Sequence, residues 1–365
     1  MASEFIGPDD PRWASFLEGV PHDVYHRPEY VRIDAGPSGG RAIAFLGEVD
    51  GARCLVPLVE SKIPKALGAP EGATDLASPY GYANPLVDGD PAKLGACLRA
   101  FAAACRERGA ICAFLRSNPL LSPPLDERVV WEDRDTSSRI RSRGETLAVL
   151  LGRPLEEIRT ELRSEYKRRL NRLRRMGFHT VVDDWRHYDR FIEVYRMTME
   201  RLGAQASYFF DRGYYDAIAT RMKGRTHLIS VLDPGGTDVV AGGLFYREGD
   251  IVQFHLSGWD PACAHLSPSK LVLWAAIEWA NDVGASWLHL GGGLGTREDE
   301  LFRFKRGFTD RRLPFHTLGI VAERRAYDEL VRASGAAPDE GYFPAYRSPR
   351  LARPSSAATD AIAAG

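Results

Sequence analysis

The hydrophobic pattern of the first 150 residues predicts three strands and one helix. Apolar runs at 41–50, 52–61 and 110–119 are bounded by turn residues, which is typical of strands. The first two runs are separated by Asp50–Gly51 and predict a hairpin. Between the second and third runs, apolar side chains recur at helical spacing and Gly109 follows as a helix end; these side chains are Leu94, Cys97, Leu98, Phe101, Ala104 and Cys105.

The second half of the chain shows the same order of patterns. Residues 155–176 predict one long helix, and two further helices are predicted at 187–203 and 211–222. Three consecutive strands, another helix and two more strands then follow, in the order 226–233, 239–250, 251–260, 268–285, 286–293 and 314–322. Each half therefore contains paired antiparallel strands, then a helix, then a further strand.

This order resembles the fold of the Gcn5-related N-acetyltransferases (GNAT). The resemblance predicts an α/β protein with mixed sheets, built from two tandem GNAT-like units. One unrelated α+β domain with a helical insertion is the alternative.

Composition and charge favour a globular protein without a global pull toward polyanions. The chain has 365 residues, 44% of them hydrophobic and 27% charged, and its 48 Lys and Arg nearly cancel its 49 Asp and Glu. Its five cysteines are scattered without a CxxC pair, which suits a reducing cytoplasm better than a disulfide framework. We recognise no signal peptide and no apolar run long enough to span a membrane, so a cytoplasmic location is expected. The Ala-, Ser- and Pro-rich residues 348–365 predict a flexible tail.

The predicted helix at 155–176 carries an unusual number of cations. One stripe of apolar residues predicts a packed face, and the remaining surface is basic. The helix is either a solvated surface helix or a site for a phosphate backbone, because arginine forks suit phosphate. The cations that would contact such a backbone are Arg163, Lys167, Arg168 and Arg172.

Several common catalytic patterns are missing from the sequence. The run Leu290–Gly295 has the spacing of neither a dinucleotide loop nor a P-loop, and it predicts a strand end that something approaches closely. There is no GxSxG motif, and Ser257 beside His255 is a lone serine. The nine histidines do not have metal-ligand spacing, so no metal site is predicted.

Three other segments leave a packing role and a binding role open. Tyr80 and Tyr82 lie in a proline-bounded turn, and Arg212 and Tyr215 lie on a predicted helix; all four could instead bind a phosphorylated or peptidic substrate. The segment ELFRFKRGF at 300–308 places cations among phenylalanines directly after the glycine cluster. Its Lys305 is either a solvated surface charge or a cation held near a reaction centre.

The order of motifs across residues 20–330 resembles the Fem-type aminoacyltransferases. The segments are SPYGYANPLV, FLRSNPLL, the basic helix, HLSGWDPACAHLSPSK with the helix that follows it, and LFRFKRGF. The resemblance implies transfer of an aminoacyl group from aminoacyl-tRNA to an amine of a peptide or nucleotide-linked acceptor, in cell-wall or peptide-antibiotic biosynthesis. It also implies a monomer that needs no cofactor beyond the tRNA substrate.

The resemblance further implies a domain division. Residues 1–147 with 315–347 would form the first domain, because the chain returns to it, and residues 148–314 would form the second. The long helical-hairpin arm of some relatives is not present in the sequence.

The resemblance also assigns roles to residues. Lys305 would stabilise the transition state or the tRNA 3′ end, with Phe304 shaping its pocket. Arg303 and Arg306 would meet phosphate or solvent. Arg212 and Tyr215 match the part of the family that holds the acceptor's phosphates, and the other candidate substrate-binding residues are Tyr80, Tyr82, Arg116, His255 and Ser257.

The donor is the main alternative that the sequence leaves open. No R/QxxGxG/A loop, which cradles the pyrophosphate of acetyl-CoA in this fold, precedes a helix. This favours a tRNA donor over an acyl-CoA donor, and an acyl-CoA-dependent N-acyltransferase is the second hypothesis. An RNA-binding module without turnover is the third.

Overall fold

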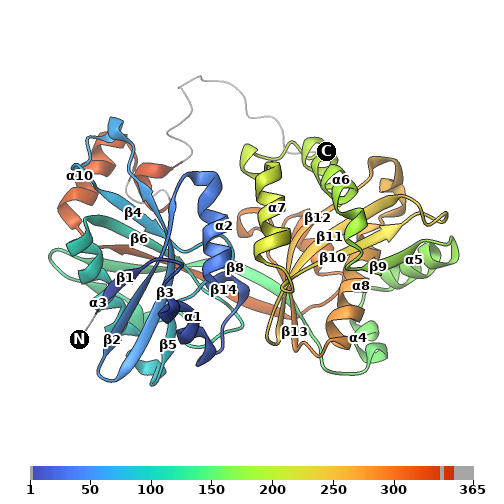
Figure 1. Ribbon diagram of the computed structural model, residues 1–365, viewed down its shortest axis with the longest axis horizontal. Helices are drawn as coiled ribbons and strands as arrows, with labels where there is room; N and C mark the ends of the chain where they lie inside the picture. Colours follow the sequence, from blue (N-terminus) through green and yellow to red (C-terminus); the bar gives the residue numbers. More distant parts are fainter. Residues whose placement is uncertain (1–2, 338–340, 349–365) are drawn as a thin grey trace.

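A computed structural model of the chain describes residues 3–337 and 341–348. The molecule has two lobes side by side, joined across the middle by two strands of one continuous sheet (Figure 1). The main path of this sheet runs β1-β2-β3-β4-β6-β14-β8-β13-β12-β11-β10-β9. Apart from Ser348, the predicted tail lies outside the described residues.

The first lobe contains the elements predicted from its hydrophobic pattern. Strands β2 (Arg41–Val49) and β3 (Ala52–Lys62) form the expected hairpin, and Asp50 and Gly51 both have positive φ at its turn. Helix α3 (Leu94–Arg108) ends at Gly109, whose φ of 81° favours glycine, and β6 (Ala110–Arg116) follows. Other elements of this lobe were not predicted: β1 (Glu4–Ile6), α1 (Pro11–Glu18), α2 (Pro28–Ser38), β4 (Thr74–Ala77), β5 (Leu86–Asp88) and β7 (Trp131–Glu132).

The second lobe also follows its predicted order. The elements are α6 (Tyr188–Arg201), α7 (Arg212–Arg221), β10 (Thr226–Leu232), β11 (Val239–Glu248), β12 (Ile251–Trp259), α8 (Ser269–Asp282) and β13 (Trp287–Gly291). The short strand β9 (His179–Val182) pairs with β10 and was not predicted.

The two lobes repeat one topology. In the first, β3 pairs antiparallel with β4, and β4 pairs parallel with β6 across the connection that holds α3. In the second, β11 pairs antiparallel with β12, and β12 pairs parallel with β13 across α8. The prediction of a mixed α/β fold with tandem GNAT-like units is confirmed.

Each lobe receives one strand from the other part of the chain. Strand β8 (Ser137–Leu150) follows the first lobe in sequence but pairs with β13 of the second. Strand β14 (Arg312–Val321) follows the second lobe but pairs with β6 of the first, and helix α10 (Arg324–Ser334) then packs near β6. The two strands pair with each other along most of their length. The domain boundaries at 147/148 and 314/315 stay predictions.

Two apolar layers cover the sheet of the second lobe. Alternate residues of a strand face opposite layers, so Ile229 and Val231 contact one helix layer and Leu228 contacts the other. The first layer holds α8 with the helices of residues 155–175, and the second holds α6, α7 and part of α2. The contact of α2 with α7 lies at the junction of the lobes (Figure 1).

The prediction of one helix over 155–176 is wrong. Helix α4 (Leu155–Glu161) ends at Leu162, and α5 (Ser164–Arg175) begins after Arg163, because both of these residues have extended backbone. The backbone N–H of Arg163 donates to the carbonyl of Gly307 at 3.0 Å, so a contact distant in sequence replaces a helical hydrogen bond. In the described part of the chain, no helix is long and apolar enough to cross a membrane.

Candidate active site

The candidate site lies where two central strands of the second lobe stop pairing. Strands β12 and β13 pair only over Ile251–Gln253 and Trp287–His289. Just beyond this point β12 has a bulge, because Leu256 and Phe254 pair with consecutive residues of β11 and leave His255 as the extra residue. The bulge and the end of pairing free backbone and side-chain groups on both strands.

Lys305 places its ammonium between these two strands. It ends the short helix α9 (Glu300–Lys305), whose N-terminus is capped by the Asp299 carboxylate. The side chain is buried, its Nζ donates to the carbonyl of Gly292 at 2.6 Å, and Nζ lies 5.8 Å from the ring centroid of Phe254. Gly292 directly follows β13 and Phe254 belongs to β12, so the cation contacts both strands.

The electrostatic state of Lys305 suits charge stabilisation. Burial lowers the pKa of Lys305 to about 8, which leaves the group mostly protonated at neutral pH. An ammonium has three N–H donors, and Gly292 takes one of them. Among the residues that the structure describes, no other acceptor binds this ammonium, so two donors remain for an oxyanion or a leaving oxygen.

Tyr82 brings a hydroxyl from the first lobe to the same place. Gly291 ends β13 with φ of 74°, and a Cβ there would lie 2.9 Å from Tyr82 Oη and 3.5 Å from Lys305 Nζ. The two polar groups therefore share the space that a side chain at position 291 would take. Burial raises the pKa of Tyr82, so its hydroxyl stays protonated and can donate.

Arg116 and Tyr80 lie close to Tyr82. The Arg116 guanidinium donates to the carbonyl of Ser78 at 2.6 Å and lies 4.9 Å from the ring centroid of Phe114. Its charge acts on Tyr80 and Tyr82, and burial lowers the pKa of Arg116. The side chain of Tyr80 is exposed. Of the predicted set, the structure thus brings Lys305 and Tyr82 together, and the charge of Arg116 acts on Tyr80 and Tyr82.

Comparison with known proteins identifies the architecture. Residues 160–306 match the family model of the acetyltransferase (GNAT) domain. The chain has the tandem acetyltransferase fold. A search of curated proteins by sequence gave no match.

Three solved structures support this assignment. The chain is similar to FemX, with a TM-score of 0.61 at 14% identity over 87% of this chain and 97% of that one. It is also similar to the C-terminal domain of a putative lysylphosphatidylglycerol synthetase from Agrobacterium fabrum (TM-score 0.54, 14% identity, 89% and 96% covered). The third is L-PGS from Bacillus licheniformis (TM-score 0.54, 14% identity, 86% and 92% covered). The predicted resemblance to Fem-type proteins is confirmed at the level of the fold.

His255 lies on the bulge of the acetyltransferase-fold sheet and is bound by a tyrosine that was not predicted. Its Nε2 lies 2.9 Å from the hydroxyl of Tyr214, and burial lowers the pKa of His255 to about 3. The predicted Tyr215 packs instead among buried aromatic side chains. A helix turns about 100° per residue, so adjacent tyrosines of α7 point in different directions, and sequence alone did not show which one faces the sheet. Ser257 is half-buried on β12.

Arg212 lies on the surface of this fold. Its side chain is 64% exposed and forms ion pairs with Asp189 and Asp216. Its binding role, like that of Tyr215 and Ser257, stays a prediction.

Phe304 is half-buried and packs against Tyr166 and Phe308, with ring centroids 6.3 and 5.8 Å apart. The hydroxyl of Tyr166 also donates to the carbonyl of Phe304 at 3.0 Å. Phe304 therefore ties α9 to α5, and its predicted role in shaping the Lys305 pocket is untested.

The cations predicted to bind RNA lie on α5 and α9, which contact each other. Arg163 directly precedes α5, and its backbone N–H donates to the carbonyl of Gly307, the residue after Arg306. Arg168 and Arg172 are exposed on α5, and Arg303 is exposed on α9. Two of the predicted cations have intramolecular partners, since Lys167 donates to the carbonyl of Thr160 and Arg306 pairs with Asp310. The basic surface thus borders the helix that carries Lys305.

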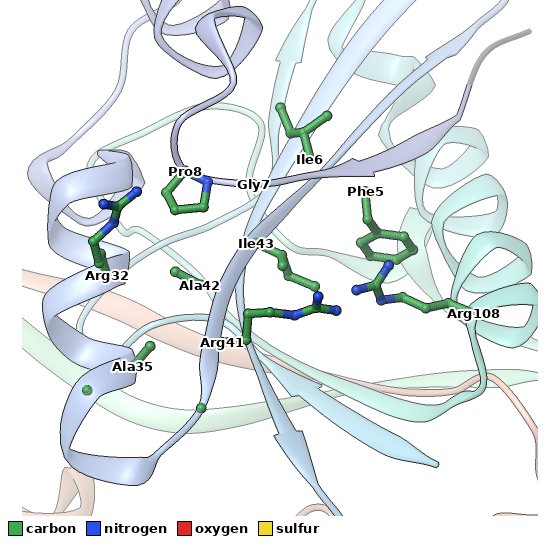
Figure 2. Close-up of a pocket in the computed structure, with 12 residues that line it drawn as sticks. Phe5, Ile6, Gly7, Pro8, Arg32, Ala35, Arg41, Ala42, Ile43 and Arg108 are labelled. Carbon is green, nitrogen blue, oxygen red and sulfur yellow. The ribbon is translucent and has the colours of Figure 1, made fainter. Parts of the chain in front are cut away.

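One cavity lies away from this site. It has a volume of about 420 Å³ and is bounded by β1, α2 and β2 of the first lobe (Figure 2). Arg41 and Arg108 converge in it below Phe5, but both guanidiniums are bound by Glu60. No residue of the predicted site lines it, so we assign it no part in catalysis.

Proposed function

We propose that the protein is an aminoacyltransferase that moves an amino acid from aminoacyl-tRNA to an amine of a peptide or peptidoglycan-precursor-like acceptor. The observation that carries the proposal is the buried Lys305 ammonium, with two donors left, between the separated ends of β12 and β13. The basic surface of α5 adjoins the same helix, which suits a polyanionic donor.

The proposed reaction is the attack of an amine on the ester of aminoacyl-tRNA. The acceptor amine attacks the ester carbonyl, the C–N bond forms, and the C–O bond to the ribose breaks. The amine loses a proton and the ribose oxygen gains one. An ester is already activated, so orientation of the reactants and stabilisation of the oxyanion supply the acceleration. Lys305 and the Tyr82 hydroxyl are the donors for that oxygen.

The turn before α8 supports a tRNA donor over an acyl-CoA donor. A pyrophosphate cradle needs several free backbone N–H groups at a helix start. Here Pro268 has no backbone N–H group. The N–H groups of Lys270 and Leu271 donate to the carbonyls of Ser267 and Pro268, so they are not free to bind a pyrophosphate. One similar structure is the C-terminal domain of a putative lysylphosphatidylglycerol synthetase. The name of that protein describes a product that carries a lysyl group, which agrees with an aminoacyl donor for this chain. We propose no cofactor beyond the charged tRNA.

The test is transfer from a mixture of charged tRNAs to candidate amines, followed by mass analysis of the products. We expect ribonuclease to abolish the activity. Acylated product formed from acyl-CoA without tRNA would instead support the acyl-CoA-dependent N-acyltransferase, which the GNAT family match favours.

Replacement of Lys305 tests its assigned role. Lys305→Ala and Lys305→Met should each lower kcat by on the order of 10²–10³, because loss of one oxyanion donor has that effect in other enzymes. Lys270→Met is the matched control, since Lys270 is also a buried lysine of the second lobe. Full transfer by folded Lys305→Met would contradict the role.

A further inference from the structure

A connected set of buried polar groups joins the two lobes and reaches Tyr82 of the candidate site. Its centre is Asp23, which is fully buried directly before the short helix Val24–His26. One carboxylate oxygen accepts from Asn118 Nδ2 at 2.8 Å and from Gln253 Nε2 at 2.5 Å, and the other accepts from the backbone N–H of Val24. Three donors converge on this carboxylate, which favours its ionised form.

The arm through Gln253 fixes the tautomer of a buried histidine. Since the Gln253 amide donates to Asp23, its Oε1 faces His289 Nδ1 at 2.8 Å. An amide oxygen only accepts, so Nδ1 of His289 carries the proton. Nε2 then accepts from the Thr146 hydroxyl at 2.8 Å. Burial lowers the pKa of His289 to about 3, so the ring stays neutral.

Both arms of the network end on Tyr82. Asn118 Nδ2, which donates to Asp23, also donates to the carbonyl of Tyr82 at 3.0 Å. The His289 ring packs edge-on against the Tyr82 ring, with centroids 4.5 Å apart. The backbone of Tyr82 is therefore held by one arm and its ring by the other, while its hydroxyl lies beside Gly291 and Lys305.

The arrangement is costly for stability. Burial raises the pKa of Asp23 to about 6, because an ionised carboxylate loses its hydration there. Apolar groups of the same shape would often stabilise a core as well or better. The polar groups also come from both lobes, since Asp23, Asn118 and Tyr82 precede β8, and Gln253 and His289 lie on β12 and β13.

We propose that Asp23 is a positioning residue that fixes the Tyr82 hydroxyl beside Lys305, through Asn118 on one side and through Gln253 and His289 on the other. The network thereby aligns a donor from the first lobe with the acyl-transfer site of the second. This inference rests on the proposed function, because the alignment concerns the oxygen of the acyl group.

Asp23→Asn tests the proposal. The side chain keeps its size, but one acceptor oxygen becomes a donor and cannot satisfy all three N–H groups. We expect kcat to fall on the order of 10-fold or more, with KM for both substrates within about twofold, because small misplacements of catalytic groups affect the transition state. Tyr82→Phe should lower kcat by a similar factor.

The double variant separates positioning from general damage. If Asp23 acts through the Tyr82 hydroxyl, Asp23→Asn should change kcat little further in a Tyr82→Phe background. Asp75→Asn is the matched control, since Asp75 is also a buried carboxylate but is bound by Arg347 and Tyr346 at another site. Its effect should be the same in both backgrounds. Independent effects of Asp23→Asn and Tyr82→Phe would overturn the proposal.

A second readout does not depend on activity. Nitrogen-15 NMR should show the Nδ1–H tautomer of His289 in the wild type and a changed tautomer population in Asp23→Asn. An unchanged population would overturn the link from Asp23 to His289. If Asp23→Asn does not fold, Gln253→Met breaks the same arm while leaving the Asn118 contact in place.

The transfer assay and the tautomer measurement together distinguish the proposed function from the positioning role of Asp23. A wild-type protein that transfers nothing from charged tRNA, yet shows the tautomer change, would contradict the proposed function and leave the network standing. A wild-type protein that transfers normally, with full kcat in Asp23→Asn, would contradict the positioning role alone.

Discussion

Lys305 is buried because of its position on the short helix α9. Its neighbours in sequence are cations, yet Lys305 follows Phe302 by three residues and lies on the same face of α9. Phe302 and Lys305 are both buried, whereas Arg303 is exposed and Arg306 is half-buried. In the structure, the face of α9 that Lys305 shares with Phe302 is buried and Arg303 is exposed, whereas the sequence alone left both environments open for Lys305.

The pKa of Lys305 predicts a descending limb in the pH–rate profile. Only the protonated amine stabilises an oxyanion, and its fraction falls from about 90% at pH 7 to about 10% at pH 9 if the pKa is about 8. We expect kcat for transfer to fall through pH 8, measured as initial rates corrected for ester hydrolysis.

Lys305→Arg provides the control for this profile. A guanidinium stays charged throughout this range, so any residual activity of the variant should lack the limb near pH 8. An identical limb in wild type and Lys305→Arg would assign the titration to another group.

Elements with strong local signals were predictable from the sequence, and elements decided by distant contacts were not. The β2–β3 hairpin, the strands β10, β11 and β12, and helix α8 followed from turn residues and periodicity. The break between α4 and α5 did not, because the hydrogen bond from Arg163 to Gly307 replaces a helical bond at a position with no helix breaker in its sequence.

The candidate site was predictable to the same extent. The motif around Lys305 and the tyrosines at 80 and 82 stood out in the sequence, and the structure brings Tyr82 to Lys305 at Gly291. The buried network did not stand out. Asp23, Gln253 and His289 are single polar residues in separate segments, and only the pairing of β12 with β13 and the contact between lobes join them.

The surface of helix α5 carries a prediction at the element scale. Arg168 and Arg172 are exposed one turn apart on this helix. Arg168→Gln with Arg172→Gln should weaken tRNA binding and lower the slope of log Kd against log salt by about 0.7–0.9 for each lost phosphate contact. Fluorescence anisotropy with labelled tRNA at increasing KCl measures both quantities.

Arg196→Gln is the control for this experiment. Arg196 is also an exposed helical arginine, but it lies on α6 and pairs with Glu200. It should leave the affinity and the salt slope unchanged. Equal slopes for the α5 double variant and the wild type would show that α5 does not contact the phosphate backbone.

Strands β8 and β14 link the two lobes, because each lobe includes one strand from the other part of the chain. The first lobe needs β14 to pair with β6, and the second needs β8 to pair with β13. Neither half of the chain therefore contains all the strands of its own lobe.

We expect the two lobes to unfold in one cooperative transition. Native-state hydrogen exchange should give the same free energy of opening for Leu115 in β6 and Leu244 in β11, within about 1 kcal/mol. Two values that differ by several kcal/mol would mean that the lobes unfold independently in spite of the shared strands.

The strand exchange also has a consequence during synthesis on the ribosome. Strand β6 emerges about 200 residues before β14, which is roughly 10–40 s at translation rates of 5–20 residues per second. Throughout that interval the edge of β6 that β14 will cover has no partner from the finished sheet. An open strand edge favours aggregation, so we expect the nascent first lobe to be the stage at which this protein is most prone to aggregate.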